Sequence, residues 1–269
     1  MKVLFCGDIV GRSGREAVLK RIPELRKRLD LDFVFANGEN AAGGFGITAA
    51  IAREFYECGV DCLTTGNHVW DQREIITHIG GDPKLLRPAN FPKATPGRGI
   101  GVYSTRTGKS VVVINVMTRL FMDPLDDPFQ ALETALAQHR LGPSAAAILI
   151  DLHGEATSEK QALAYMVDGR ASLVVGSHSH VPTADARVMP GGTGYQTDAG
   201  MCGDYDSIIG MKKDVATQRF IRKMPGERLT PAEGEGTLCA IYAELDDATG
   251  LAKRVAPVRL GGQLAEAMP

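Results

Sequence analysis

Two histidines that stand two residues apart are the first candidates for chemistry in this sequence. His178 and His180 follow directly after the apolar run at residues 173–175. Residues i and i+2 of an extended segment project to the same side, so both rings are expected to face one ion at the carboxyl end of a strand. Such pairs also occur on solvated loops. The pair alone therefore leaves metal binding and an ordinary polar surface both open.

Four further apolar stretches end in the same way. They are followed by Asp8, by Glu39 with Asn40, by Asn67 with His68, and by His153. Taken singly, an aspartate after a strand is more often a helix cap, and a lone histidine is more often a satisfied polar residue. The carboxyl ends of parallel strands converge on one crevice, however, so the recurrence predicts a shared metal site.

The types of these side chains narrow the choice of metal. Carboxylates, asparagine oxygens and imidazoles form a mixed oxygen and nitrogen set, which suits Fe, Mn, Zn or Co better than Ca or Cu(I). The set is too large for one tetrahedral zinc ion. It fits two ions about 4 Å apart that share a carboxylate, lower the pKa of a bridging water and stabilise a phosphoryl group during displacement. The predicted reaction is phosphoester hydrolysis.

The elements that would position these residues alternate between strand and helix. Strands at residues 3–6, 32–36 and 62–65 are each followed by a helical pattern, the second at 48–58 and the third at 71–79. Later segments predict a hairpin at 101–105 and 110–116, helices at 129–138 and 159–167, strands at 146–152 and 172–175, and hairpins at 187–197 and 237–259. We expect an α/β fold, a layered α/β/β/α sandwich of two mixed sheets, with residues 1–269 forming a single domain.

Composition excludes several classes of protein. The 269 residues include 32 acidic and 30 basic side chains, and this near balance gives no general attraction to nucleic acid or to an anionic membrane. No stretch approaches the ~20 apolar residues of a transmembrane helix, so we expect a cytoplasmic protein. The 5 cysteines are odd in number and scattered, which indicates core thiols and no disulfide framework.

The order and spacing of these motifs resemble a known superfamily. Residues 7–8, 66–68, 153–154 and 176–180 resemble the signature blocks of calcineurin-like metallophosphoesterases. The segments G-D-I-V-G (7–11), N-G-E-N-A (37–41), G-N-H-V-W-D (66–71) and R-P-A-N (87–90) are similar to the bacterial YmdB-like branch. That resemblance implies a phosphodiesterase acting on 2′,3′-cyclic or 3′,5′-cyclic nucleotides.

The resemblance also implies roles for individual residues. One ion would be bound by Asp8, Asn40 and His180, the other by Asn67, His153 and His178, with Glu39 bridging the two. The ions would be divalent or trivalent, namely iron or manganese, with zinc as a further candidate. A metal-bridging hydroxide would attack phosphorus, and His68 would act as general acid on the leaving oxygen.

This chain departs from the superfamily pattern at two places. Val10 occupies the histidine position of the usual D-x-H block, and Glu39 stands where the bridging residue is usually aspartate. Asn40 is a candidate to replace the donor lost at Val10. The aspartate that commonly orients the catalytic histidine has no counterpart, and Asp71 is the nearby candidate for that role with His68.

Other functions and partners remain open at this point. One alternative is a regulatory or RNA-associated phosphate-binding metalloprotein with little turnover, although His68 favours an enzyme and the charge balance does not indicate RNA. A metal-dependent amidase or peptidase is disfavoured because no H-E-x-x-H motif is present. Phe45 and Trp70 are candidates to stack on a nucleobase or simply to pack. The late antiparallel strands are a candidate contact for a homo-oligomer.

Overall fold

Two mixed sheets face each other in the computed structural model, which describes residues 1–224 and 226–269. The first sheet has the order β13 (Ala252–Leu260), β12 (Leu238–Leu245), β1 (Lys2–Cys6), β3 (Phe33–Asn37), β4 (Cys62–Thr64). The second has the order β5 (Ile100–Ser104), β6 (Ser110–Met117), β7 (Ala147–His153), β8 (Leu173–Ser177), β10 (Gly194–Gln196), β9 (Arg187–Val188). A short parallel pair joins β2 (Asp8–Ile9) to β11 (Met201–Cys202).

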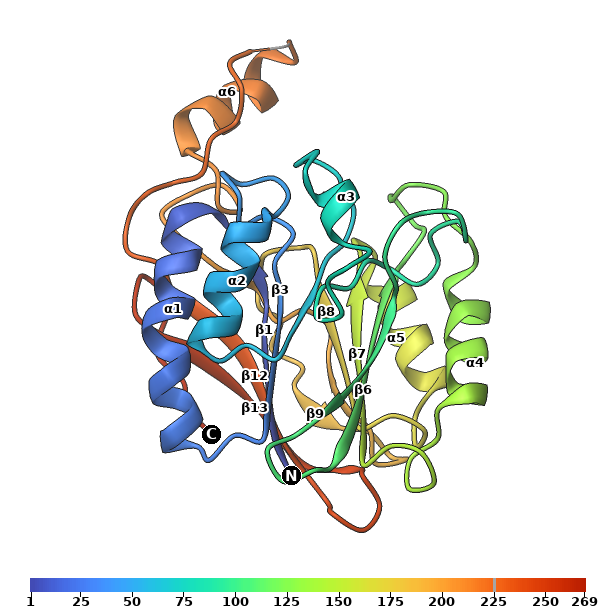
Figure 1. Cartoon of the computed structure of the whole chain (residues 1–269). Helices are drawn as coiled ribbons and strands as arrows, with labels where there is room; N and C mark the ends of the chain where they lie inside the picture. Colours follow the sequence, from blue (N-terminus) through green and yellow to red (C-terminus); the bar gives the residue numbers. More distant parts are fainter. Residues whose placement is uncertain (225) are drawn as a thin grey trace.

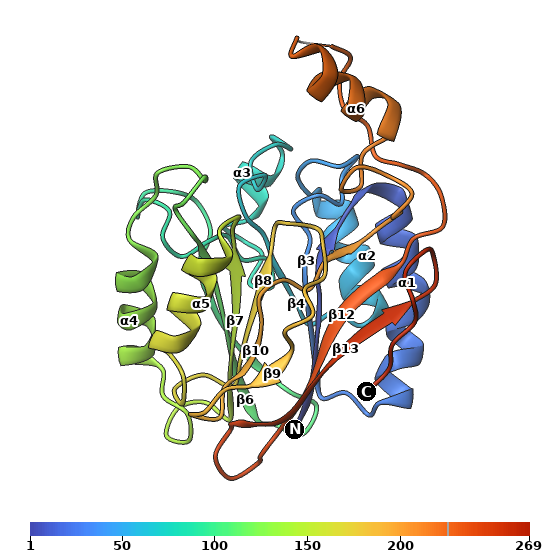
Figure 2. The same ribbon diagram turned by 180° about the vertical axis from the view of Figure 1, so that it is seen from behind.

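Alternating side chains explain why the sheets stack in layers. In β1, Leu4 and Cys6 pack in the same cluster as the apolar residues of α1 (Gly11–Arg28) and α2 (Ala49–Cys58), whereas Val3 and Phe5 lie in the core between the sheets. The strands of the second sheet alternate likewise, so that α4 (Pro128–Gln138) and α5 (Thr157–Met166) cover its outer face. Figures 1 and 2 show the two helical layers on opposite sides of the sheets. The predicted α/β/β/α sandwich is confirmed.

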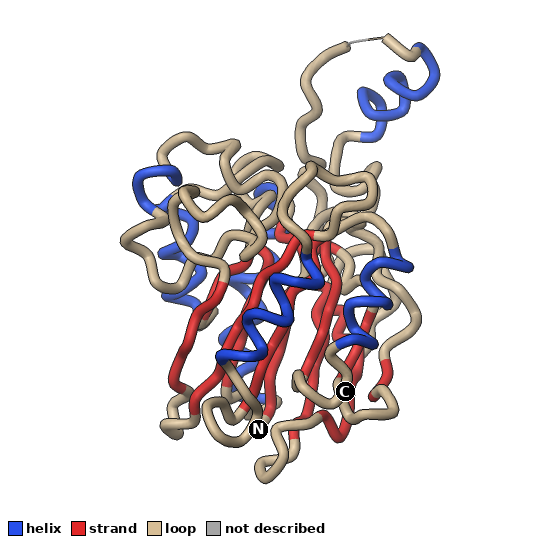
Figure 3. The backbone as a smooth tube through the Cα atoms, turned by 90° about the vertical axis from the view of Figure 1, so that its right-hand side faces the viewer, coloured by secondary structure: helices blue, strands red, loops and turns tan. Residues whose placement is uncertain are grey.

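The direction of the strands places the loops that carry the candidate ligands at one end. Strands β1, β3 and β4 are parallel, as are β6, β7, β8 and β10, so their carboxyl ends lie together. Long loops crowd this end in Figure 3, and α3 (Ile75–His78) lies there as well. Helix α6 (Lys213–Arg222) projects beyond this end and is connected to the body of the protein by two extended segments (Figure 1).

The structure corrects some predicted elements. The helix predicted at 71–79 is reduced to Ile75–His78, because the preceding residues form turns whose side chains bond elsewhere: Asp71 contacts His68, and Gln72 donates to the carbonyl of Phe45. Helix α6 and the β2–β11 pair were not predicted. Only Ala216 of α6 is buried, and its larger apolar side chains Phe220 and Ile221 are exposed.

Two further expectations can be compared with the structure. The 5 cysteines all carry free thiols, and four of them are buried. No helix in the described part of the chain is long and apolar enough to cross a membrane.

Candidate metal centre

The predicted ligands lie together where strands of both sheets end. Asp8 follows β1, Glu39 and Asn40 follow β3, Asn67 and His68 follow β4, His153 ends β7, and His178 and His180 follow β8. These residues form two sets, each of which takes its name from one histidine. The His153 group is Asn67, His153 and His178, and the His180 group is Asp8, Asn40 and His180.

The His153 group surrounds a single ring nitrogen. His153 is fully buried, and its Nε2 atom lies 2.9 Å from Asn67 Oδ1, 3.0 Å from Glu39 Oε1 and 3.1 Å from His178 Nδ1. The candidate ligand atoms of Glu39, His153 and His178 all lie within 4.8 Å of one another. A single ring nitrogen carries either one proton or one lone pair, so it cannot form good hydrogen bonds with all three neighbouring atoms. A cation between these atoms would satisfy all of them.

The His180 group lies beside the first. Asp8 Oδ1 is 3.9 Å from both His153 Nδ1 and His180 Nε2. His180 Nδ1 donates to the carbonyl of Ile209 at 2.8 Å, which leaves Nε2 unprotonated in the neutral ring. Asn40 Nδ2 donates to Gly44 O at 3.1 Å, so Asn40 Oδ1 remains as the ligand atom of that amide.

Three buried oxygen atoms of the site accept no hydrogen bond. They are Asp8 Oδ1, Glu39 Oε1 and Asn40 Oδ1. Folded proteins leave few buried acceptors unpaired, and such atoms call for a specific explanation. The approach of His153 Nε2 to Glu39 Oε1 is a charge contact and not an aligned hydrogen bond. Acceptors that converge from separate loops without donors fit bound cations.

The buried charges of the site shift the pKa values of its members. Burial raises the pKa of Asp8 to about 6, against the attraction of two neighbouring histidines. Burial acts in the same direction on Glu39, but the charges of His153 and His68 and their contacts with the carboxylate together outweigh it and lower the pKa of Glu39 to about 2. Burial would keep His153 neutral, yet Glu39 and Asp8 raise its pKa to about 9. Burial and the charge of His153 lower the pKa of His178 to about 3, which keeps its lone pair available.

A buried network behind His153 fixes its ring. Ser177 Oγ lies 2.9 Å from His153 Nδ1 and donates to Asp151 Oδ1 at 2.6 Å. The other oxygen of Asp151 accepts from Thr64 Oγ1 at 2.5 Å and from Asn37 Nδ2 at 3.0 Å. His153 therefore donates from Nδ1 and directs Nε2 to the site. Asp151 was not predicted from the sequence, although it lies two residues before His153 on the same face of β7.

The loop that carries the H-x-H pair does not continue the strand as predicted. Strand β8 ends before it, and φ is 96° at His178 and 64° at His180, values that non-glycine residues seldom adopt. The two rings consequently do not project from an extended segment. The loop is held by Asp198, which accepts from the backbone of Ser179 at 3.1 Å and pairs with buried Lys160 at 2.9 Å.

His68 lies at the edge of the site with two fixed contacts. Its Nδ1 atom is 2.8 Å from Asp71 Oδ2, so the contact predicted for Asp71 is confirmed. Its backbone N–H donates to Glu39 Oε2 at 3.0 Å, which ties the position of His68 to that of the carboxylate. With Nδ1 engaged, Nε2 is the ring nitrogen left for a substrate.

A cleft of about 320 Å³ opens over these groups. Its lining residues are Glu39, Asn40, Phe45, His68, Glu155, His178, Ser179, His180, Ile209, Met211 and Leu229. Phe45 is thus part of the site, with its ring 5.2 Å from that of His68 in an edge-on arrangement. Trp70 packs edge-on against Phe91 and is not among the lining residues.

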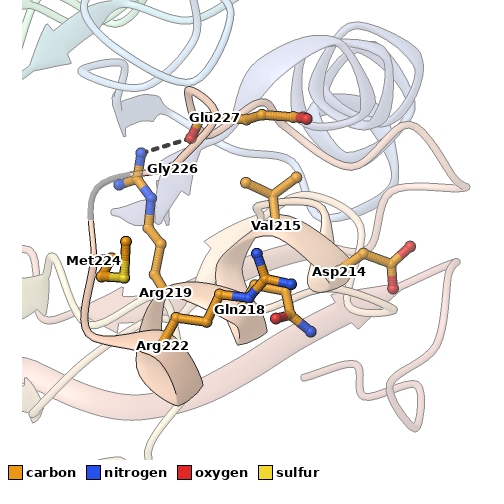
Figure 4. A pocket seen from close by; sticks show the side chains of 8 residues that line it. All are labelled: Asp214, Val215, Gln218, Arg219, Arg222, Met224, Gly226 and Glu227. Atoms are coloured by element: carbon orange, nitrogen blue, oxygen red, sulfur yellow. Dashed lines mark hydrogen bonds between the residues drawn. The ribbon is translucent and has the colours of Figure 1, made fainter.

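A second cavity, of about 280 Å³, is formed by α6 and the chain that follows it (Figure 4). Arg219 crosses this cavity and donates to Glu227 O at 2.8 Å. Of the residues that line it only Val215 is partly buried, and none is a predicted ligand. We assign the chemistry to the cleft over the two histidine groups.

Comparisons with known proteins identify the family of this chain. The chain matches the family model "YmdB-like protein" over residues 4–258. It is 46% identical, over 255 residues that cover 95% of each chain, to a 2′,3′-cyclic-nucleotide 2′-phosphodiesterase from Bacillus subtilis (strain 168).

Two solved structures are similar along most of the chain. A hypothetical protein from Thermus thermophilus is 42% identical, with a TM-score of 0.90 over 97% of this chain and 99% of that one. A novel phosphatase from Mycoplasma pneumoniae is 27% identical, with a TM-score of 0.89 over 97% of this chain and 93% of that one. The resemblance drawn from the motifs is confirmed, and this chain belongs to the YmdB-like family of metallophosphoesterases.

Proposed function

We propose that this chain hydrolyses 2′,3′-cyclic nucleotides at a site for two metal ions. The observation that carries the proposal is the convergence of three unpaired buried oxygens, on Asp8, Glu39 and Asn40, with the imidazoles of the two histidine groups. Family membership and the 46% identity to a curated diesterase make the chain a phosphoric diester hydrolase. The cyclic nucleotide is the substrate that the name of that relative states, and it is extended here to this chain.

The donor atoms divide naturally into two sets. The His153 group would hold one ion and the His180 group the other, with Glu39 shared between them because its charge acts on both His153 and Asp8. Mixed oxygen and nitrogen donors suit iron, manganese or zinc. When bound, the ions would supply an activated water and neutralise the charge that develops on the phosphoryl oxygens.

The chain itself would supply the proton for the leaving group. Asp71 accepts the hydrogen bond from His68 Nδ1 and orients the ring, so that the Nε2 proton of the imidazolium is directed into the cleft. Hydrolysis adds one water. Its oxygen bonds to phosphorus, the bond from phosphorus to the 2′ oxygen breaks, and that oxygen takes the proton from His68. The product is a nucleoside 3′-monophosphate.

The test is hydrolysis of 2′,3′-cyclic AMP by protein that has been stripped of metal and resupplied with Mn²⁺ or Fe²⁺. We expect metal-dependent turnover that falls about 10²–10⁴-fold in His68→Ala, with metal content unchanged. The loss should be smaller on a diester with a nitrophenolate leaving group, which needs no proton. His78→Ala is a matched control, because His78 contacts Asp82 at 3.2 Å and does not line the cleft.

Two outcomes would change the assignment. Equal losses on both substrates would remove the general-acid role of His68. Metal binding without turnover of either diester would favour the alternative, a phosphate-binding regulatory protein. The contact between His68 and Asp71 disfavours that alternative, since binding alone requires no oriented proton donor.

A further inference from the structure

The cleft is lined by two chemically different sets of side chains. The candidate ligands and His68 form the reacting end, and the apolar side chains of Phe45, Ile209, Met211 and Leu229 form a second set, which we call the apolar wall. We propose that the apolar wall binds the base of the nucleotide substrate, with Phe45 as the stacking residue. This inference rests on the proposed function, because it names the part of the substrate that the rest of the cleft receives.

The backbone fixes Phe45 beside the reacting end. Its loop turns through Gly44 and Gly46, with φ of 90° and 76°, and a Cβ at Gly46 would lie 2.9 Å from the backbone of Gln72. The Gln72 side chain donates to Phe45 O at 2.8 Å. The ring is thereby held edge-on to His68, 5.2 Å away between centroids. A substrate that receives a proton from His68 must therefore pass close to this ring.

The opposite side of the wall comes from a distant part of the sequence. Met211 and Leu229 pack with Phe45 in one small hydrophobic cluster that also contains Val10. Ile209 stands at the rim with 52% of its surface exposed, and its carbonyl accepts the hydrogen bond from His180. The wall is thus attached to the His180 group through the backbone of Ile209.

A nucleobase fits this surface for chemical reasons. One ribose separates the base of a cyclic nucleotide from its phosphate, so a base must lie in the same cleft as the reacting end. Aromatic and aliphatic side chains offer a π face and dispersion contacts but no donors or acceptors that distinguish one base from another. We therefore expect the presence of a base to matter much more than its identity.

The experiment compares a substrate with a base and a substrate without one. Metal-loaded protein is assayed on 2′,3′-cyclic AMP and on glycerol 1,2-cyclic phosphate. The wild-type protein should prefer the nucleotide by at least about tenfold in kcat/KM, and Phe45→Ala should lose about tenfold on the nucleotide alone. Phe45→Leu keeps the packing and lacks the π face, so it should show the same selective loss if the alanine variant folds poorly. Phe220→Ala on α6, where the ring is 69% exposed, is the matched control and should change neither rate.

The outcomes separate this inference from the proposed function. Equal loss on both substrates would mean that Phe45 acts by positioning His68, and no loss on either would mean that it does not contact substrate. Each of these results overturns the inference and leaves the diesterase assignment in place.

If the wild-type protein hydrolyses neither substrate, the proposed function fails. Calorimetry with adenosine 3′-monophosphate and glycerol 2-phosphate then tests binding at the apolar wall independently of turnover. Weaker binding of the nucleotide alone by Phe45→Leu would support the inference, and unchanged binding would overturn it.

Discussion

The two histidine groups of the candidate metal centre use the same kinds of donor but are supported very differently. Behind His153 lies a buried hydroxyl and then a buried carboxylate, Ser177 and Asp151, both on strands of one sheet. Behind His180 lies one backbone carbonyl, that of Ile209, in a loop where this β-branched residue has a φ of 46°. The ring of His153 is thus fixed by the sheet, whereas the ring of His180 is fixed by a loop. We expect the His153 group to hold its ion more firmly than the His180 group does.

The largest effect should come from the residue that the two groups share. Glu39→Gln removes the charge that both proposed ions would use, so metal content after dialysis should fall from about two ions per chain to one or none, and turnover should be lost. Elemental analysis measures the content. Glu133→Gln is a matched control, because Glu133 forms an exposed pair with Arg170. Two ions retained in Glu39→Gln would show that neither half depends on the bridge.

A smaller and selective effect is expected behind His153. Asp151→Asn should weaken metal binding at the His153 group about 10–100-fold, because it removes the acceptor of the Ser177 proton and loosens the ring. Binding at the His180 group should change little. Ile209→Ala keeps the carbonyl that supports His180 and should leave both affinities nearly unchanged. Calorimetric titration of the metal-free protein resolves the two sites. Equal weakening at both sites in Asp151→Asn would show that Asp151 does not support the His153 group selectively.

The smallest effect concerns pH and the metal-free protein. Burial opposes protonation of His153, but Glu39 and Asp8 outweigh it and raise the pKa of His153 from 6.5 to about 9. A raised pKa means that its contribution to stability is fully present below pH 6.5 and is lost as the pH rises through about 9. The free energy of unfolding of the metal-free protein should therefore fall across this window.

Urea titrations at three pH values within that window measure the change. Loading with metal should suppress it, because metal ligation replaces the proton on His153. A metal-free protein that is equally stable at pH 6.5 and pH 9 would contradict the assigned charge of His153.

The strand patterns predicted the sheets because successive side chains point to opposite faces of a strand even where both faces are buried. Leu4 and Phe5 face different layers, as their positions in β1 require, and the ligands follow from where each strand stops. The backbone of the H-x-H loop was predicted wrongly, because it is held by residues distant in the sequence: His178 N donates to Asp8 and Ser179 N donates to Asp198. Propensity does not encode such contacts.

Two other features escaped prediction for different reasons. Asp151 serves the site through Ser177 rather than directly, and a buried carboxylate inside an apolar strand gives no spacing signal of its own. Helix α6 buries only Ala216 and exposes Phe220 and Ile221, so the apolar positions of its sequence do not mark a face packed against the body.

The two chain segments that flank α6 are hydrogen-bonded to each other where they join the body of the protein, and this has a consequence for how the protein can be altered. Lys212 N donates to Thr230 O at 2.9 Å, and Met211 pairs with Pro231 as an antiparallel bridge. The chain thus leaves the body and returns to it at one point, and the buried residue of α6, Ala216, packs there in the same cluster as Met211. Because the entropy of closing a loop changes only slowly with its length, α6 is open to replacement by another hairpin that keeps a small apolar side chain at the place of Ala216. The apolar wall and both histidine groups lie outside α6, so designed variants can exchange this helix while the catalytic body stays the same.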